Sequence, residues 1–207
     1  MILYIETNLI MAIAKGQDEQ AEQMLNNMPV NVDLRIPTVC YMEAIVALET
    51  ERQRRNKFLE NVETEIKQLK RDLTSDVSSL VSQLETLRLA YDKSLNDFEE
   101  KFVNSIILIR TKAESIELPL NSLRATFTDP ILKKERQLRD DLLLQCILDD
   151  AQLHRNEQKV LLTGNSSDFG GAEVQQVLKK SGIIEYFRNT TEFLRWLQKQ
   201  NISEEKT

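Results

Sequence analysis

The stretch Met1-Ile2-Leu3-Tyr4-Ile5-Glu6-Thr7-Asn8 decides the fold class. Its apolar run, Ile2 to Ile5, has β-branched and aromatic members, which is typical of a strand buried on both faces of a parallel sheet. The run ends at a carboxylate, a hydroxyl and an amide, and Leu9 to Ala14 then reads as a helix. Polar residues at such a junction lie at the carboxyl edge of the sheet, where open α/β folds place their sites. The simpler alternative is that Glu6 only caps the helix and Asn8 turns the chain.

The same order of strand, polar residues and helix recurs along the chain. Asp33 to Thr38 reads as a second strand, and a helix with Glu43 near its start follows it. Lys159 to Thr163 is the clearest strand and runs into a polar loop that contains Asp168. A helix, a short strand and a last helix then complete the alternation, at residues 172–180, 183–187 and 191–199. This alternation predicts a three-layer α/β/α fold with a central parallel sheet.

Composition limits the classes of function. The chain has 207 residues with a net charge of -6, so no overall basic field indicates nucleic acid. An acidic metal site would itself contribute negative charge, so a nuclease is not excluded. Cys40 and Cys146 lie in apolar surroundings, which favours buried reduced thiols and a cytoplasmic location. We expect no signal peptide and no membrane contact, because no apolar run is long enough to span a bilayer.

The middle of the chain is one long helical pattern. Between Pro37 and Pro119 there is no glycine or proline, and apolar residues recur every three or four positions from Phe58 to Ile106. One rod from Glu43 to Ser115 would be about 110 Å long. We therefore predict a hairpin of two helices that breaks at Thr74-Ser75-Asp76. The hairpin either packs on itself and the sheet or pairs with a second copy or a partner helix.

The connection from this hairpin to the last part of the sheet reads as a link and a helix. Pro119 ends the hairpin, and Leu120 to Phe127 is predicted to be an irregular link. Thr128-Asp129-Pro130 is predicted to open a helix that continues to Ala151.

Four acidic motifs in this order resemble the PIN-domain ribonucleases. Glu6-Thr7-Asn8 is similar to the family's Asp-x-Asn-like motif, and Glu43 matches a glutamate in an early helix. Asp140-Asp141-Leu142-Leu143-Leu144 is similar to its Asp-x-Leu-Ile-like helix start. Thr163 to Phe169 resembles its Thr-x-Asp-x-x-Asp-Phe-like loop, with Asn165 where many members have aspartate and Asp168 as the remaining carboxylate. The chain departs from the family's pattern at two positions, Asn165 and Glu6. The carboxylate of Glu6 reaches one methylene farther than that of aspartate.

The resemblance divides the chain into two parts. Residues 1–50 and 128–207 would form the PIN-like α/β domain, and residues 51–127 would be a helical insertion. Through it a homo-oligomer or a partner protein would assemble. The resemblance also implies RNA as the substrate. The Arg52, Arg54, Arg55 and Lys57 cluster and the Lys133, Lys134, Arg136 and Arg139 cluster either follow its phosphate backbone or are solvated helix faces.

The chemistry of such a site follows from its carboxylates. Carboxylates held close together repel one another unless a cation lies between them, and hard oxygen ligands suit Mg²⁺ or Mn²⁺. Such an ion lowers the pKa of a bound water and stabilises charge on a phosphodiester. Glu6, Glu43, Asp141 and Asp168 would be the catalytic metal ligands, with Asp140 competing with Asp141, and Asn8, Thr163 and Asn165 would orient ligands or waters.

The sequence thus predicts a Mg²⁺- or Mn²⁺-dependent endoribonuclease. The alternative is a catalytically degenerate PIN-like module whose helical arm serves binding and assembly. His154, the only histidine, reads as a polar residue on a helix.

Overall fold

The computed structural model describes residues 1–71, 77–132 and 137–204. The predicted hairpin break at Thr74-Ser75-Asp76 lies outside these residues, as do Lys133, Lys134 and Arg136 of the second basic cluster.

A parallel sheet of five strands in the order β3-β2-β1-β4-β5 forms the centre of the fold. The strands are β1 (Ile2–Ile5), β2 (Asp33–Pro37), β3 (Glu114–Ile116), β4 (Lys159–Leu162) and β5 (Ile183–Phe187). The apolar runs of β1 and β4 lie in the middle and are buried along their whole length, because helices cover both faces there. This confirms the predicted α/β fold with a central parallel sheet.

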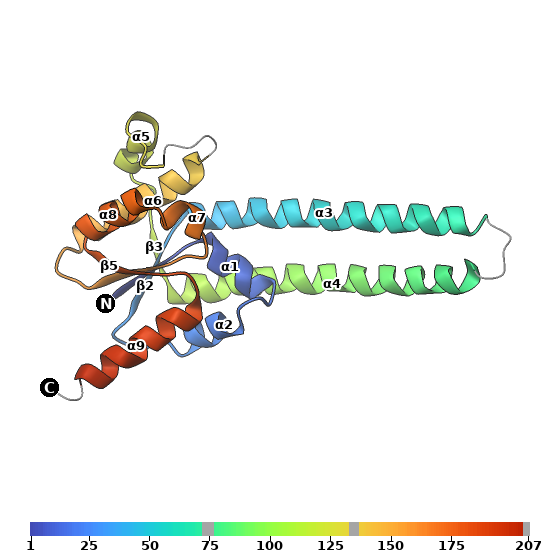
Figure 1. Ribbon diagram of the computed structural model, residues 1–207, viewed down its shortest axis with the longest axis horizontal. Coiled ribbons are helices and arrows are strands. Elements are labelled where there is room, and N and C mark those ends of the chain that lie inside the picture. Colours follow the sequence, from blue (N-terminus) through green and yellow to red (C-terminus); the bar gives the residue numbers. More distant parts are fainter. Residues whose placement is uncertain (72–76, 133–136, 205–207) are drawn as a thin grey trace.

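Helices cover the sheet on both faces and make the three layers visible in Figure 1. One layer contains α5 (Leu120–Thr128), α6 (Leu138–Leu153), α7 (Ser166–Phe169) and α8 (Ala172–Lys180). The other contains α1 (Thr7–Ala14), α2 (Glu19–Asn26), α9 (Thr190–Glu204) and the base of α4 (Val77–Lys112). Within the part of the chain that the structure describes, no helix has the length and apolarity needed to cross a membrane. Cys40 and Cys146 are both buried and free, as predicted.

The long helices α3 (Val39–Leu69) and α4 pack against each other and project from the body as an arm (Figure 1). The predicted helical hairpin is thereby confirmed. The base of α4 belongs to the main core through Leu95, Phe98, Phe102 and Ile109, whereas Val62, Ile66 and Val81 form a separate small cluster farther out. The limits 51–127 of the insertion stay a prediction, although Glu114–Ile116 within them forms an edge strand of the sheet.

Two local predictions are wrong. Leu120 to Phe127 is not an irregular link, because α5 begins directly after Pro119, whose extended backbone serves as its N-cap. Thr128-Asp129-Pro130 closes this helix rather than opening the next one, and the backbone N–H of Asp129 donates to the carbonyl of Ala125. Contacts with α6, including a 2.5 Å hydrogen bond from the Ser122 hydroxyl to Asp149, hold α5 in place.

Candidate active site

Four predicted carboxylates come together at the carboxyl edge of the sheet. Glu6 follows β1, Glu43 lies near the start of α3, Asp140 is in the first turn of α6 and Asp168 is in α7. Their charges act on one another. The charge of Glu43 raises the pKa of both Glu6 and Asp140, and the charge of Asp168 raises the pKa of Asp140. The parallel topology thus brings together acidic residues that are far apart in the sequence, since 162 positions separate Glu6 from Asp168.

Glu6 is buried and held on both carboxylate oxygens. The Thr163 hydroxyl donates a 2.8 Å hydrogen bond to Oε1, and the backbone N–H of Asn8 donates a 2.9 Å bond to Oε2. The second bond makes Glu6 the N-cap of α1, so it is both a helix cap and a member of the acid cluster. Burial is the main cause that raises the pKa of Glu6 to about 7, and the two hydrogen bonds oppose it.

Glu43 is oriented by a residue that the sequence did not single out. The hydroxyl of Thr7 donates a 2.5 Å hydrogen bond to Oε2 of Glu43, and the guanidinium of Arg139 lies 3.8 Å from Oε1. The signal for Thr7 was its place between Glu6 and Asn8, because a residue at the first position of α1 lies at the same sheet edge. Glu43 itself is partly exposed, with 18% of its side chain accessible, so it faces solvent at this edge.

Asn165 bridges the two aspartates of the cluster. Its side-chain amide donates hydrogen bonds of 3.2 Å to Asp140 and 2.8 Å to Asp168. Gln137, which the sequence reasoning missed, donates to the other oxygen of Asp168. Burial first, and then the charges of Glu43 and Asp168, raise the pKa of Asp140. An amide at position 165 therefore separates two repelling carboxylates, which an aspartate in its place could not do.

Asp141 lies outside this cluster. It is fully buried, and its Oδ1 accepts hydrogen bonds of 2.7 Å and 2.8 Å from the backbone N–H groups of Ile131 and Leu132. Its Oδ2 has no hydrogen-bond partner in the described part of the chain. Successive residues of a helix point about 100° apart, so only one of Asp140 and Asp141 can face the sheet edge. Asp140 faces the sheet edge, and Asp141 binds the backbone of Ile131 and Leu132 before α6.

The donor set suits a hard cation in its chemistry. Glu6, Glu43, Asp140 and Asp168 offer carboxylate oxygens. Burial first, and then neighbouring carboxylates, raise the pKa of Glu6 and Asp140, and a cation would favour the charged form of both. Among the described residues, however, no three acidic, histidine or cysteine side chains are placed closely enough to form a metal-binding group. Coordination would require these side chains to turn toward a common point.

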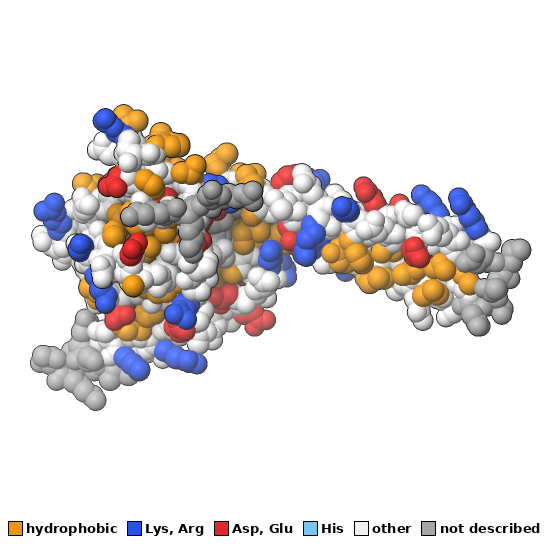
Figure 2. All heavy atoms as spheres, turned by 45° about the horizontal axis from the view of Figure 1, so that its top comes forward, with side chains coloured by type: hydrophobic (Ala, Val, Ile, Leu, Met, Phe, Trp, Pro, Cys, Tyr) orange, Lys and Arg blue, Asp and Glu red, His pale blue; other side chains and the backbone are white. Residues whose placement is uncertain are grey.

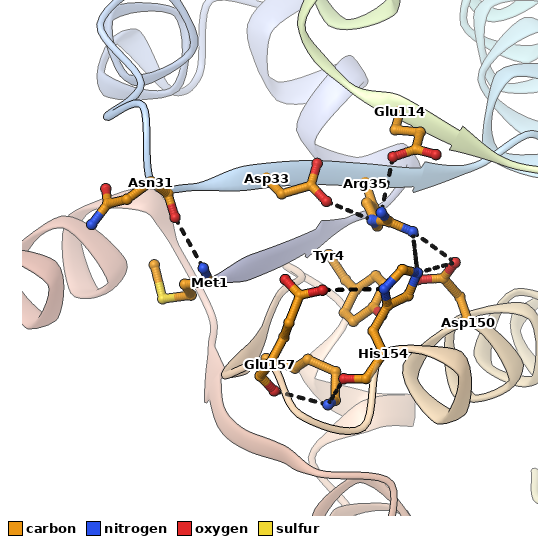
Figure 3. A network of polar contacts seen from close by, with 10 residues as sticks. Met1, Tyr4, Asn31, Asp33, Arg35, Glu114, Asp150, His154 and Glu157 are labelled. Atoms are coloured by element: carbon orange, nitrogen blue, oxygen red, sulfur yellow. Dashed lines mark hydrogen bonds and ion pairs between the residues drawn. The ribbon is translucent and has the colours of Figure 1, made fainter.

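His154 lies at the opposite end of α6, about 21 Å from Asp140 along the helix axis. It closes the helix and belongs to a network with Arg35, Asp150 and Glu157 (Figure 3). The Nε2 atom of His154 lies 2.7 Å from Nη1 of Arg35. Because a guanidinium nitrogen can only donate, Nε2 accepts this hydrogen bond, and the ring proton is on Nδ1, which faces Glu157. The network joins α6 to β2, and His154 is structural.

The first basic cluster is engaged within the arm. Arg54 and Arg55 both form ion pairs with Glu51, at 2.7 Å and 2.9 Å, and Arg52 lies 3.2 Å from Glu99. Arg55 also lies over the ring of Phe98. Arg52 and Arg55 thus join α3 to α4, and Arg54 pairs within α3. Of the second cluster, the described Arg139 lies beside Glu43.

The sheet order and the three layers define an α/β protein with acidic side chains at the carboxyl edge of its parallel sheet. The family model of the PIN domain matches residues 3–169, which is most of the chain. The chain therefore belongs to the PIN-domain family, whose members generally use divalent metal ions. No curated protein and no solved structure shows significant similarity to it.

Proposed function

We propose that the chain is an endoribonuclease that cleaves RNA phosphodiester bonds with the help of Mg²⁺ or Mn²⁺. The observation that carries the proposal is the gathering of Glu6, Glu43, Asp140 and Asp168 at one sheet edge, with Asp140 and Asp168 bridged by Asn165. Family membership supports the nuclease class.

The residues of the chain divide the work. Glu43, Asp140 and Asp168 are only partly buried, so their oxygens are the accessible ligands. The buried Glu6 is the fourth carboxylate of the ligand set. Thr7, Thr163 and Asn165 fix the orientation of all four carboxylates through their hydrogen bonds. A bound divalent ion would supply a water of lowered pKa and a counter-charge for the phosphodiester.

The test is cleavage of an end-labelled RNA of mixed sequence by the purified chain with Mn²⁺, Mg²⁺ or EDTA. The site variant carries Glu43→Gln and Asp140→Asn, which remove two charges and keep the side-chain shapes. We expect cleavage by the wild type with a divalent ion and a loss of at least about a hundredfold in the variant. EDTA should abolish cleavage.

A matched control carries Glu60→Gln and Asp92→Asn on exposed positions of the arm. It loses the same two charges and should cleave like the wild type. Equal loss of RNA with the wild type and the site variant would mean a contaminating nuclease and would refute the proposal. So would intact RNA in every divalent-ion sample.

The second candidate function is an assembly module that uses the arm. Large apolar side chains are exposed along α3 and α4 at Phe58, Leu80, Leu87 and Leu89, and Figure 2 shows apolar surface along the arm. A second copy or a partner helix could cover them. Light scattering at rising concentration tests self-association, with Leu80→Ser and Leu87→Ser as the variant. A strict monomer would exclude pairing between copies.

A further inference from the structure

A cavity of about 390 Å³ opens beside the acid cluster. Its walls come from α1, from the end of β4 and from the turn between β5 and α9. It shares Asn8, Thr163 and Gly164 with the edge that holds Glu6. Ligand pockets in proteins measure about 300–1,000 Å³, so the cavity fits one nucleotide but not a duplex.

Two exposed cations line this cavity, Lys15 from α1 and Arg188 after β5. Within the described residues the guanidinium of Arg188 has no ion pair. The ammonium of Lys15 has only a long contact, 3.9 Å to Glu51. The cavity's carboxylate, Asp18, is occupied, because it accepts hydrogen bonds from the Thr190 hydroxyl at 2.6 Å and from the backbone N–H of Ala21 at 3.0 Å. The lining of the cavity thus has two cations and one carboxylate, a net charge of +1, in a chain of net charge -6.

The cavity on the other side of the acids has the opposite character. It measures about 290 Å³ and lies next to Asp168 and Gln137. Its described lining residues include Glu173 and no lysine or arginine. Among the described lining residues, those that compensate the charge of a polyanion at the acid cluster are therefore Lys15 and Arg188 of the first cavity.

We infer that the Lys15–Arg188 cavity binds the sugar-phosphate backbone of single-stranded RNA next to the bond that is cut. Lys15 and Arg188 pair with backbone phosphates. The exposed side-chain amides of Asn8 and Asn189 line the same cavity and can donate hydrogen bonds to hydroxyl and phosphate oxygens. The inference rests on the proposed nuclease function, since it assigns the path of that enzyme's substrate.

The experiment measures binding of a short fluorescein-labelled single-stranded RNA by anisotropy in EDTA, where metal-dependent cleavage cannot occur. The Lys15→Ala and Arg188→Ala double variant should bind at least about tenfold more weakly than the wild type. The slope of log K against log salt should fall by about 1.4, since each phosphate contact on a single strand contributes about 0.7. Replacing Arg188 by lysine in place of alanine should restore part of the affinity for RNA.

The matched control is Lys179→Ala with Lys180→Ala, two exposed lysines at the end of α8. It loses the same charge and should bind within about twofold of the wild type. Equal affinity of the cavity variant and the wild type, with unchanged circular dichroism, would overturn the inference. Equal weakening by both double variants would also overturn it, because binding would then follow net charge alone.

The outcomes separate this inference from the proposed function. If the wild type cleaves RNA but the cavity variant binds it normally, the cavity assignment fails and the nuclease stands. If the wild type never cleaves RNA, the nuclease proposal fails, and the binding measurement alone then decides whether the cavity takes an RNA strand.

Discussion

The hydroxyl of Thr163 donates a 2.8 Å hydrogen bond to the carboxylate of Glu6 and so ties the end of β4 to the end of β1. These strands are neighbours at the centre of the sheet, and both side chains are buried. The bond fixes a carboxylate where desolvation opposes its charge. The acid cluster therefore has one member whose ionisation is linked to folding and to any cation nearby.

The first prediction concerns pH. The pKa of Glu6 is about 7 in the folded protein against 4.5 without perturbation, so the folded state holds a proton that the unfolded state releases in this range. The free energy of unfolding that Glu6 contributes therefore falls as pH rises from about 4.5 to 7 and stays low above it. Between about pH 4 and pH 8 in EDTA, Glu6→Gln should gain roughly 3 kcal/mol relative to the wild type. Urea unfolding at several pH values measures this, and a flat difference would contradict it.

The second prediction concerns metal. A ligand that binds only the folded state stabilises it by about 2.7 kcal/mol at a hundred times its Kd. Mn²⁺ should therefore raise the melting temperature of the wild type, and EDTA should reverse the rise. In the variant with Glu43→Gln and Asp140→Asn the rise should be lost. Thermal melts with and without Mn²⁺ test this, and an equal rise in both proteins would place the ion elsewhere.

The third prediction separates two adjacent aspartates. Asp141→Ala removes two hydrogen bonds to the backbone of Ile131 and Leu132 and should lower the free energy of unfolding by about 2–4 kcal/mol. Asp140→Ala removes a partly exposed charge that its neighbours repel and should change it by less than about 1 kcal/mol. Urea denaturation compares them. Equal stability of both variants would show that Asp141 does not hold the loop.

The fourth prediction concerns the network of Figure 3. Arg35→Leu removes the guanidinium that lies 3.1 Å from the carboxylate of the buried Asp150. The hydroxyl of Tyr4, which donates to this carboxylate at 2.7 Å, then remains as its partner. We expect a loss of about 3–5 kcal/mol in the free energy of unfolding. Adding Asp150→Asn should recover part of it, because the charge left unpaired is then absent. Additive losses in the double variant would mean that the pair is not coupled.

The fifth prediction concerns the arm. Phe58 and Tyr91 face each other across it with ring centroids 4.6 Å apart, so a short Gly-Ser linker can join them in place of residues 59–90. The deleted part holds the separate cluster of Val62, Ile66 and Val81, so the rest should lose no more than about 1 kcal/mol. A deeper deletion that also removes Leu95 and Phe98 should destabilise the domain strongly, since both belong to the main core. Urea unfolding of both proteins tests this.

The sequence predicted the elements whose residues carry their own pattern. β1 is a continuous apolar run, β4 is apolar from Val160 to Leu162, and the arm repeats apolar residues at helical spacing. β3 could not be predicted, because Glu114, Ser115 and Ile116 form no such pattern. Pairing with β2 makes this strand, together with the 2.9 Å ion pair between Glu114 and Arg35. Its cause lies in tertiary structure and not in local preference.

The site was predictable in its order but not in its details. The motifs named Glu6, Glu43, Asp168 and Asp141, with Asp140 competing with Asp141, and the sheet brings Glu6, Glu43, Asp140 and Asp168 to one edge. The choice between Asp140 and Asp141 depends on how α6 is rotated, and the backbone of Ile131 and Leu132 fixes that rotation. Thr7 and Gln137 gave no signal beyond proximity, because their role depends on carboxylates distant in the sequence.

Glu43 and the arm belong to one uninterrupted helix, and α3 continues for about 39 Å beyond Glu43 to Leu69. A helix of this kind acts as a lever whose short end carries Glu43 of the acid cluster. A load that tilts the far end would displace the Glu43 carboxylate from Thr7, with no contact to the pocket itself. The position of Glu43 in the acid cluster is thus coupled to the orientation of the described part of α3, and a helix-breaking Gly-Gly insertion near Lys57 would remove this coupling.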